Sequence, residues 1–190
     1  MNNLHSQHGV GLIEVMVALL LLAVAILGFS AMQLSAIKAT DESLVRTQSI
    51  STIKTLSESM RILPNSSSTY RTEVNKIYQS NRSSENEFNV GSYCESVDTY
   101  NTTASNCTTS NCSVEQVVKY SVASVLKAAC AKEIALNIEK CPDTSGVNER
   151  QCIIASWNRT KPTMQEEKYS CTNANGSYKP SASCFIMEAY

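Results

Sequence analysis

Residues 8–33 read "HGVGLIEVMVALLLLAVAILGFSAMQ", and this stretch decides how the chain is organised. From residue 12 to residue 32 only Glu14 and Ser30 interrupt an apolar run. At about 1.5 Å of rise per residue, a helix of this length matches the roughly 30 Å hydrocarbon layer of a bilayer. A charged carboxylate at the centre of such a helix costs about 2.5–3.5 kcal/mol. The sequence therefore predicts a transmembrane helix in which Glu14 needs a compensating partner.

The helical pattern continues beyond the apolar run. No proline occurs before Pro64, and apolar residues recur at mostly helical spacing up to Leu63. We therefore predict one long helix over residues 10–63, with its membrane-spanning part at 10–32. An ordinary secretory signal is the competing interpretation. The apolar run is longer than the usual core of such a signal, contains an acid and follows no Lys or Arg.

The residues "GVGLIE" at 9–14, followed by an uninterrupted apolar run, resemble the class III signal of type IV pilins and pseudopilins. The resemblance implies that a leader, residues 1–9, is removed after Gly9 by prepilin peptidase. It also implies that Val10 becomes the methylated N-terminus and that Glu14 acts in assembly. Two departures stand out: Val10 occupies a position that is most often Phe, and the leader lacks Lys and Arg.

Elementary electrostatics supports these roles. Cleavage after Gly9 creates an ammonium group on Val10, and Glu14 lies four residues on, on the same helix face. Negative side chains are also stabilised near helix N-termini by the exposed backbone N–H groups. In a bundle of helices that excludes water, Glu14 can pair with the ammonium of its own chain or of a neighbour. Because an unpaired charge there would be expelled, this pairing would enforce the register of subunits.

The composition of the chain argues against several classes of function. The chain has 190 residues, a net charge of -1 and 16 Lys and Arg without a basic run, so we expect no nucleic acid partner. His5 and His8 are the only histidines and lie in the leader. No C-x-x-C pair and no glycine-rich phosphate loop occurs, so we expect no metal, no cofactor and no catalytic residues. The eight cysteines behind a membrane segment indicate disulfides in an oxidising compartment.

The rest of the chain changes composition twice. Residues 64–112 are rich in Ser, Thr and Asn, which predicts a surface connection with room for a short helix near Val74 and Tyr78. Residues 113–190 are expected to form a globular helix plus sheet. A capping box of Ser113 and Gln116 begins the helix. Strands are expected at 134–138, at "CIIASWN", at "EKYSC" and at "SCFIMEAY".

Two disulfides follow from these predicted strands. Cys141 and Cys152 bracket the loop between two adjacent strands. Cys171 and Cys184 bracket the last hairpin in the same way. Closing a loop of this size stabilises the fold by about 3 kcal/mol.

The other four cysteines leave a choice. A helix between Cys112 and Cys130 would separate them by about 27 Å, too far for a bond. Two arrangements remain: Cys94 with Cys130 and Cys107 with Cys112, or Cys94 with Cys112 and Cys107 with Cys130. We favour the first.

The distal chain resembles the minor pilins of the PilV type, in a "CP…RQC…W" hairpin and a cysteine-bearing last strand that ends "MEAY". The resemblance implies an α+β pilin fold, in which the long helix packs on a disulfide-stapled antiparallel sheet. It also implies a single-pass inner-membrane protein with a periplasmic globular domain, later found in the surface pilus.

As implied partners we take prepilin peptidase, other minor pilins, the major pilin and a tip adhesin. The implied roles are pilus initiation at the tip and support of twitching motility, adhesion or DNA uptake. A type II secretion pseudopilin and a membrane-tethered, disulfide-rich binding module are the alternatives.

Overall fold

The computed structural model describes residues 11–82, 87–142, 144, 146, 149–173 and 175–189. The chain divides into two units, residues 1–43 and 44–190. One continuous helix, α1 (Leu12–Ile62), supplies most of the first unit and enters the second. The helix ends just before Pro64, which begins a 3-10 turn, η1 (Pro64–Ser66). A residue before proline is disfavoured in helical conformation, which explains this end point.

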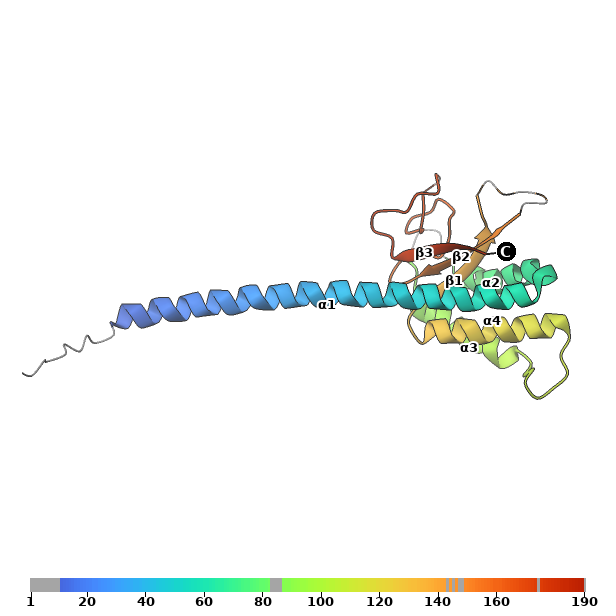
Figure 1. Ribbon diagram of the computed structural model, residues 1–190, viewed down its shortest axis with the longest axis horizontal. Helices are drawn as coiled ribbons and strands as arrows, with labels where there is room; N and C mark the ends of the chain where they lie inside the picture. Colours follow the sequence, from blue (N-terminus) through green and yellow to red (C-terminus); the bar gives the residue numbers. More distant parts are fainter. Residues whose placement is uncertain are drawn as a thin grey trace, which may run out of the picture. The chain divides into compact units, whose positions relative to one another are not determined.

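The second unit combines helices with one small sheet (Figure 1). Its helices are α2 (Ser67–Asn81), α3 (Val90–Thr103) and α4 (Val114–Cys130). Its strands are β1 (Ala135–Lys140), β2 (Gln151–Ser156) and β3 (Cys184–Ala189), in the order β1-β2-β3. Both strand pairs are antiparallel. The predicted α+β class, with a long N-terminal helix and an antiparallel sheet, is confirmed.

The register of the sheet sorts its side chains onto two faces. Ile138 lies opposite Ile153, and Ile153 lies opposite Met187, so these three share one face. Ile154 and Ile186 are partners on the other face. Because side chains alternate along a strand, a slip of one residue would exchange the two faces.

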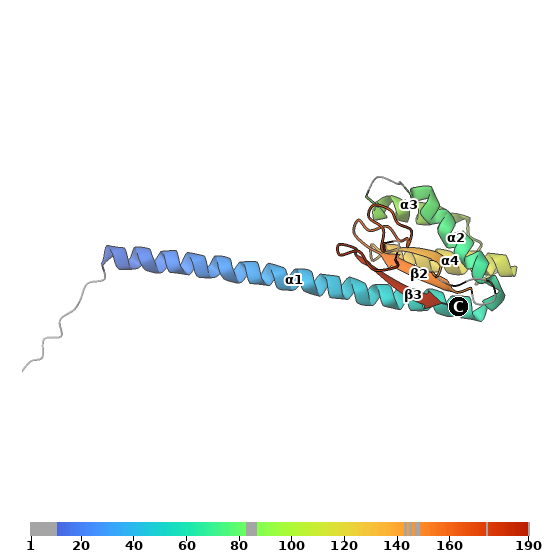
Figure 2. The same ribbon diagram turned by 90° about the horizontal axis from the view of Figure 1, so that it is seen from above.

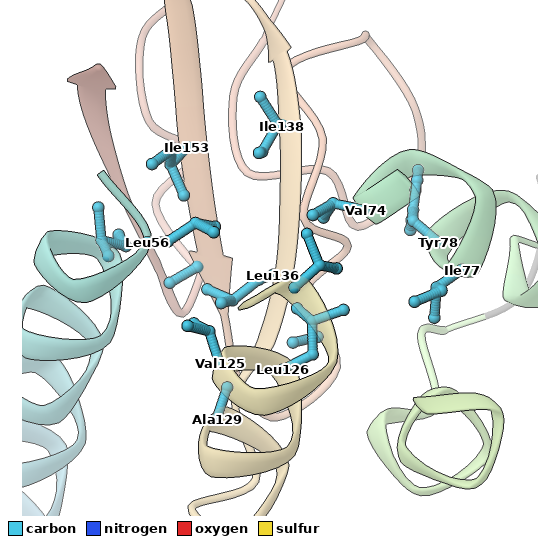
Figure 3. Packing of buried hydrophobic residues seen from close by; sticks show 14 of the residues in the cluster. Leu56, Val74, Ile77, Tyr78, Val125, Leu126, Ala129, Leu136, Ile138 and Ile153 are labelled. Atoms are coloured by element: carbon cyan, nitrogen blue, oxygen red, sulfur yellow. The ribbon is translucent and has the colours of Figure 1, made fainter. Parts of the chain in front are cut away.

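The main core lies between the helices and the first of these faces (Figure 3). Leu56 of α1, Val74 of α2 and Leu126 of α4 are fully buried there against Leu136 and Ile153. Figure 2 shows β3 beside the part of α1 that belongs to the second unit. A smaller cluster covers the opposite face, where Ile154 and two cysteines are buried beneath the chain between β2 and β3.

The start of α4 is confirmed at the predicted residue. The Ser113 side chain accepts a hydrogen bond from the Gln116 backbone N–H at 3.3 Å. The Gln116 side chain in turn accepts one from the Ser113 N–H at 2.8 Å. This reciprocal capping box satisfies two N–H groups that an α-helix leaves without partners at its N-terminus.

Residues 64–112 differ in part from the expected surface connection. They contain α2 and α3, and Tyr70, Tyr78 and Tyr93 are each at most 1% exposed in the main core. Residues 104–112 form no helix or strand, and none of them is buried.

Tyrosines supply much of the buried apolar surface of α2 and α3, together with the aliphatic Val74, Ile77 and Val97. An aromatic ring buries a large apolar area despite its hydroxyl. The predicted short helix near Val74 is part of α2, which is longer than expected.

The stretch "EKYSC" also differs from expectation. It forms no strand and takes part only in an isolated bridge between Lys161 and Ser170. Tyr169 has a left-handed backbone with φ 66°, which breaks the extended conformation in the middle of the stretch.

Four disulfides tie the second unit together. Cys94 bonds to Cys130, Cys107 to Cys112, Cys141 to Cys152 and Cys171 to Cys184. These are the four pairings favoured above. The first bond joins α3 to the end of α4, and the third joins the ends of β1 and β2.

Candidate functional site

Glu14 lies in the first turn of α1 and is exposed. Its backbone N–H donates to the Gly11 carbonyl at 3.0 Å, and the Val15 N–H donates to the same oxygen at 3.3 Å. These bonds place the carboxylate where unpaired N–H groups create a partial positive charge. Gly9 and Val10, the expected cleavage and methylation residues, lie outside the described residues.

The helix around Glu14 exposes apolar side chains on every side. Glu14 is the one charged residue between residues 11 and 37. The α1 helix is long and apolar enough to cross a membrane, and its apolar part is not buried. A helix that is hydrophobic all round needs lipid or other helices around it. The large apolar side chains that it exposes in the first unit are Leu12, Ile13, Val15, Met16, Val17, Leu19, Leu20, Leu21, Leu22, Val24, Ile26, Leu27, Phe29, Met32, Leu34 and Ile37.

Polar side chains in this part of α1 bond to the helix itself. The Ser30 hydroxyl donates to the Ile26 carbonyl at 2.9 Å, and the Thr40 hydroxyl donates to the Ala36 carbonyl at 2.9 Å. Such back-bonding satisfies a hydroxyl without a partner outside the helix. Glu14 accepts no comparable local bond in the described residues, so its carboxylate is available to a partner group.

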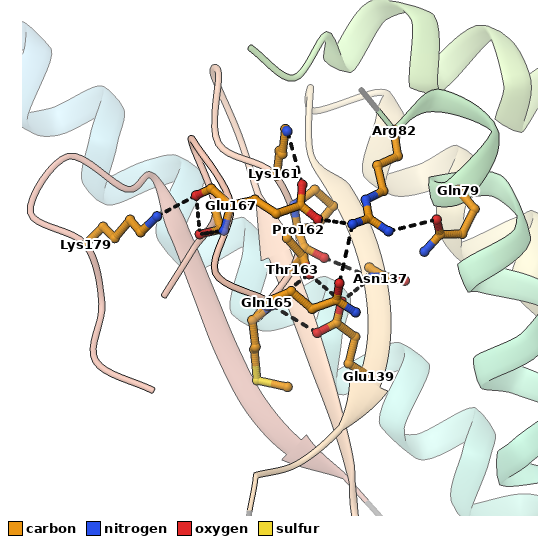
Figure 4. Close-up of polar contacts among 12 residues, drawn as sticks. Gln79, Arg82, Asn137, Glu139, Lys161, Pro162, Thr163, Gln165, Glu167 and Lys179 are labelled. Carbon is orange, nitrogen blue, oxygen red and sulfur yellow. Dashed lines mark hydrogen bonds and ion pairs between the residues drawn. The ribbon is translucent and has the colours of Figure 1, made fainter. Parts of the chain in front are cut away.

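A second group of polar residues lies in the second unit, where Glu167 is the centre of an ion-pair network (Figure 4). Arg82, just after α2, and Lys161 both bind the Glu167 carboxylate. The side chains of Lys161 and Glu167 are only 1% and 10% exposed. Because removal of one partner would leave a buried charge, this network fixes the loop after β2 to the end of α2.

Glu139 of β1 holds the same loop from the sheet side. Its carboxylate accepts hydrogen bonds from the Thr163 hydroxyl at 2.6 Å and the Met164 N–H at 3.0 Å. Burial raises the pKa of Glu139, and these two hydrogen bonds oppose that rise. Neighbouring Asn137 adds a bond from its amide to the Pro162 carbonyl at 2.9 Å. The sequence offered no spacing signal for this network, because its members come from distant segments.

A cavity of about 820 Å³ lies between α2 and β1. Arg71, Lys76 and Lys140 line it, and each is already paired with a glutamate. Its charges are therefore internally compensated. In the part of the chain that the structure describes, no group of His, Cys, Asp and Glu is arranged to hold a metal ion, and the cysteines are all in disulfides.

Two protein families match the chain. Residues 4–30 match the prokaryotic N-terminal methylation motif, and residues 31–123 match the family described as type IV pilin Tt1218. No curated protein and no solved structure is significantly similar to the chain. The first match contains Gly9, Val10 and Glu14, and the second runs from the apolar part of α1 into α4.

Proposed function

Because this chain is a class III prepilin-type pilin, we propose that it is a minor pilin that helps to initiate type IV pilus assembly and is incorporated at or near the pilus tip. The observation that carries this proposal is the exposed Glu14 in the first turn of α1, the single charge in the apolar run of that helix and part of the matched methylation motif. The likeness of the distal chain to minor pilins of the PilV type supports the minor role.

Assembly would proceed through a charge pair made by processing. Prepilin peptidase removes residues 1–9, and the new ammonium of Val10 becomes available to a glutamate. Both groups belong to the end of an apolar helix, where a lone charge is costly. Pairing Glu14 with the Val10 ammonium of its own chain or of a neighbour removes that cost. A correctly docked subunit is thereby favoured over one that is shifted along its neighbours.

The motif and the apolar helix fit membrane anchoring followed by incorporation into a pilus. We propose that the second unit is periplasmic before incorporation and lies at the cell surface afterwards. Its partners would be other minor pilins, the major pilin and a tip adhesin. Through them the protein would support twitching motility, adhesion or DNA uptake.

The assembly role is tested by Glu14→Ala in cells that lack the wild-type chain. We expect the variant to be processed and retained in the inner membrane, but strongly depleted from sheared pili. Asp41→Ala, which changes an exposed acid of the same helix beyond the apolar run, is the matched control and should leave incorporation unchanged. Normal piliation with the Glu14→Ala protein present in sheared pili would overturn the assembly role.

The minor role is tested by the amount of the chain in purified pili and by its deletion. We expect far fewer copies than of the main subunit, and fewer pili per cell after deletion. If the chain formed most of the pilus mass, it would be a major pilin. If deletion left pili intact but blocked protein secretion, a pseudopilin role would replace the one proposed.

A further inference from the structure

A cavity of about 770 Å³ lies among the loops between β2 and β3, and its wall is cationic. Arg159, Lys168 and Lys179 line it, and none of the described residues that line it is an Asp or Glu. Hydroxyl and amide side chains complete the wall, among them Asn158 and Ser181. This combination contrasts with the cavity between α2 and β1, where each cation has a glutamate partner.

Two of the three cations of this wall have no ion-pair partner among the described residues. Lys179 donates to the backbone carbonyl of Glu167 at 2.5 Å, and the Lys168 ammonium lies 5.2 Å from the centre of the Tyr169 ring. Within the described residues neither lysine forms an ion pair. The nearby Glu167 carboxylate is bound by Lys161 and Arg82 (Figure 4). A carbonyl and a ring orient an ammonium group without neutralising it.

Arg159 adds a third cation at the cavity. It pairs with Glu87 at 2.8 Å, but the two side chains are 73% and 43% exposed. Glu87 therefore partly compensates Arg159, although an exposed pair contributes little to stability. The two lysines carry the charge of the wall that has no ion-pair partner in the part of the chain that the structure describes.

The wall is held in shape by covalent and backbone bonds. Cys171 and Cys184 are joined, and their neighbours Ser170 and Ser183 both line the cavity. The Lys161 N–H also donates to the Tyr169 carbonyl at 2.8 Å.

Two residues of the wall have a left-handed backbone, Asn158 with φ 58° and Tyr169 with φ 66°. Asparagine adopts this region comparatively often, whereas a bulky residue such as Tyr169 does so rarely. Such conformations persist only where the surrounding structure enforces them, and they are concentrated at binding sites.

We propose that this cavity binds an acidic saccharide, with the sugar carboxylate on Lys168 and Lys179. The volume is in the range of small-ligand sites, roughly 300–1,000 Å³. The Asn158 amide and the Ser181 hydroxyl match the hydroxyl groups of a sugar, and the half-buried ring of Tyr169 offers an apolar face. Nucleic acid fits less well, because a phosphate backbone needs a longer basic track than three cations in a chain of net charge -1.

The site is tested with the mature full-length chain in detergent micelles, titrated calorimetrically with trigalacturonate at low salt. We expect saturable binding that weakens as salt is raised. Lys168→Gln with Lys179→Gln should raise the Kd by about tenfold or more, the loss expected from two charge-assisted contacts. Lys127→Gln with Lys132→Gln, two exposed lysines outside the cavity, is the matched control. Lys168→Gln alone changes only an exposed side chain, so a weaker affinity for this folded variant would support the site.

Four results would overturn the proposal. One is the absence of binding at about 10 mM trigalacturonate, because a built site would have a Kd below this concentration. Equal binding of uncharged galactotriose would exclude carboxylate recognition. Equal binding of inorganic phosphate would show a general anion site without saccharide recognition. Binding of a single-stranded oligonucleotide that depends on the two lysines, without binding of trigalacturonate, would assign the cavity to nucleic acid. None of these results depends on Glu14 or on incorporation into a pilus.

Discussion

The hydroxyl of Tyr93 on α3 binds both backbone groups of Leu136 at the outer edge of β1. It donates to the Leu136 carbonyl at 2.8 Å and accepts from the Leu136 N–H at 3.3 Å. Because β1 is an edge strand of the sheet, no neighbouring strand lies on this side to bind these two groups. A side chain from a helix thus replaces the missing strand and protects an edge that would otherwise be open to pairing.

Tyr93→Phe should therefore destabilise the second unit. Tyr93 and Leu136 are both fully buried, so the variant leaves two backbone groups without water or a partner. We expect a loss of about 1–3 kcal/mol in the free energy of unfolding, measured with urea. Tyr120→Phe, at a half-buried position on α4, is the control. Equal stability of the Tyr93→Phe protein and the wild type would show that water replaces the hydroxyl.

The disulfides should differ in how much they stabilise the second unit, according to the length of the loop that each one closes. Cys94 and Cys130 are 36 residues apart, whereas Cys107 and Cys112 are 5 apart. Loop entropy predicts losses of about 4 and about 2 kcal/mol when each pair is replaced by alanine. Urea unfolding of the two double variants measures the difference. The opposite order would mean that native packing around the bonds outweighs loop closure.

Acid should weaken the contact between α2 and the loop that follows β1. Hydrogen bonds from Lys140 and Arg71 lower the pKa of Glu149 from 4.5 to about 2. A carboxylate with a lowered pKa stabilises the folded state above its unfolded pKa, and this contribution is lost as the pH falls from about 4.5 to about 2.

Glu149→Gln should consequently be less stable than the wild type at pH 7 and nearly equal to it at pH 2. The measured quantity is the difference in stability between the two proteins at each pH. Glu139, whose pKa is raised, changes the stability with pH in the opposite direction, but it does so in both proteins and cancels from the difference. Urea midpoints at both pH values provide the measurement, with the exposed Glu95→Gln as control. A difference that stays constant with pH would contradict the role of ionised Glu149.

Leader removal should depend on Gly9, which lies outside the described residues. In Gly9→Val we expect the leader to remain, because the motif requires glycine before the cut. Intact mass and N-terminal sequencing should show a start at Val10 for the wild type and for His8→Ala, the control in the same leader. A wild-type protein that keeps Met1, or begins after Ala25 or Ala31, would contradict processing at this site.

Local signals account for the features that were predictable. The apolar run predicts the first part of α1, and the Ser113 capping box predicts where α4 begins. Alternation at Leu136 and Ile138 predicts β1, although the strand begins one residue later than expected. Each of these signals lies within one element, where neighbouring residues alone decide the outcome.

The burial of the tyrosines was not predicted from the sequence. The sequence places Val74, Ile77 and Tyr78 on one face of a short helix, but the low apolar content of the stretch predicts that it lies on the surface. The main core completes that face with residues from α4 and β1, distant in the chain.

The sequence by itself determined the apolar run with its single acid, the cysteine-rich character of the distal chain, and the places of α4 and of the three strands that form the sheet. Only the tertiary structure decided that α2 and α3 join the core, that Tyr93 closes the edge of β1, and that Lys168 and Lys179 line one cavity. The physical reason is the separation along the chain over which each kind of signal acts. Helical period, capping and strand alternation act between residues a few positions apart, whereas burial, edge pairing and charge clusters depend on which distant segments meet.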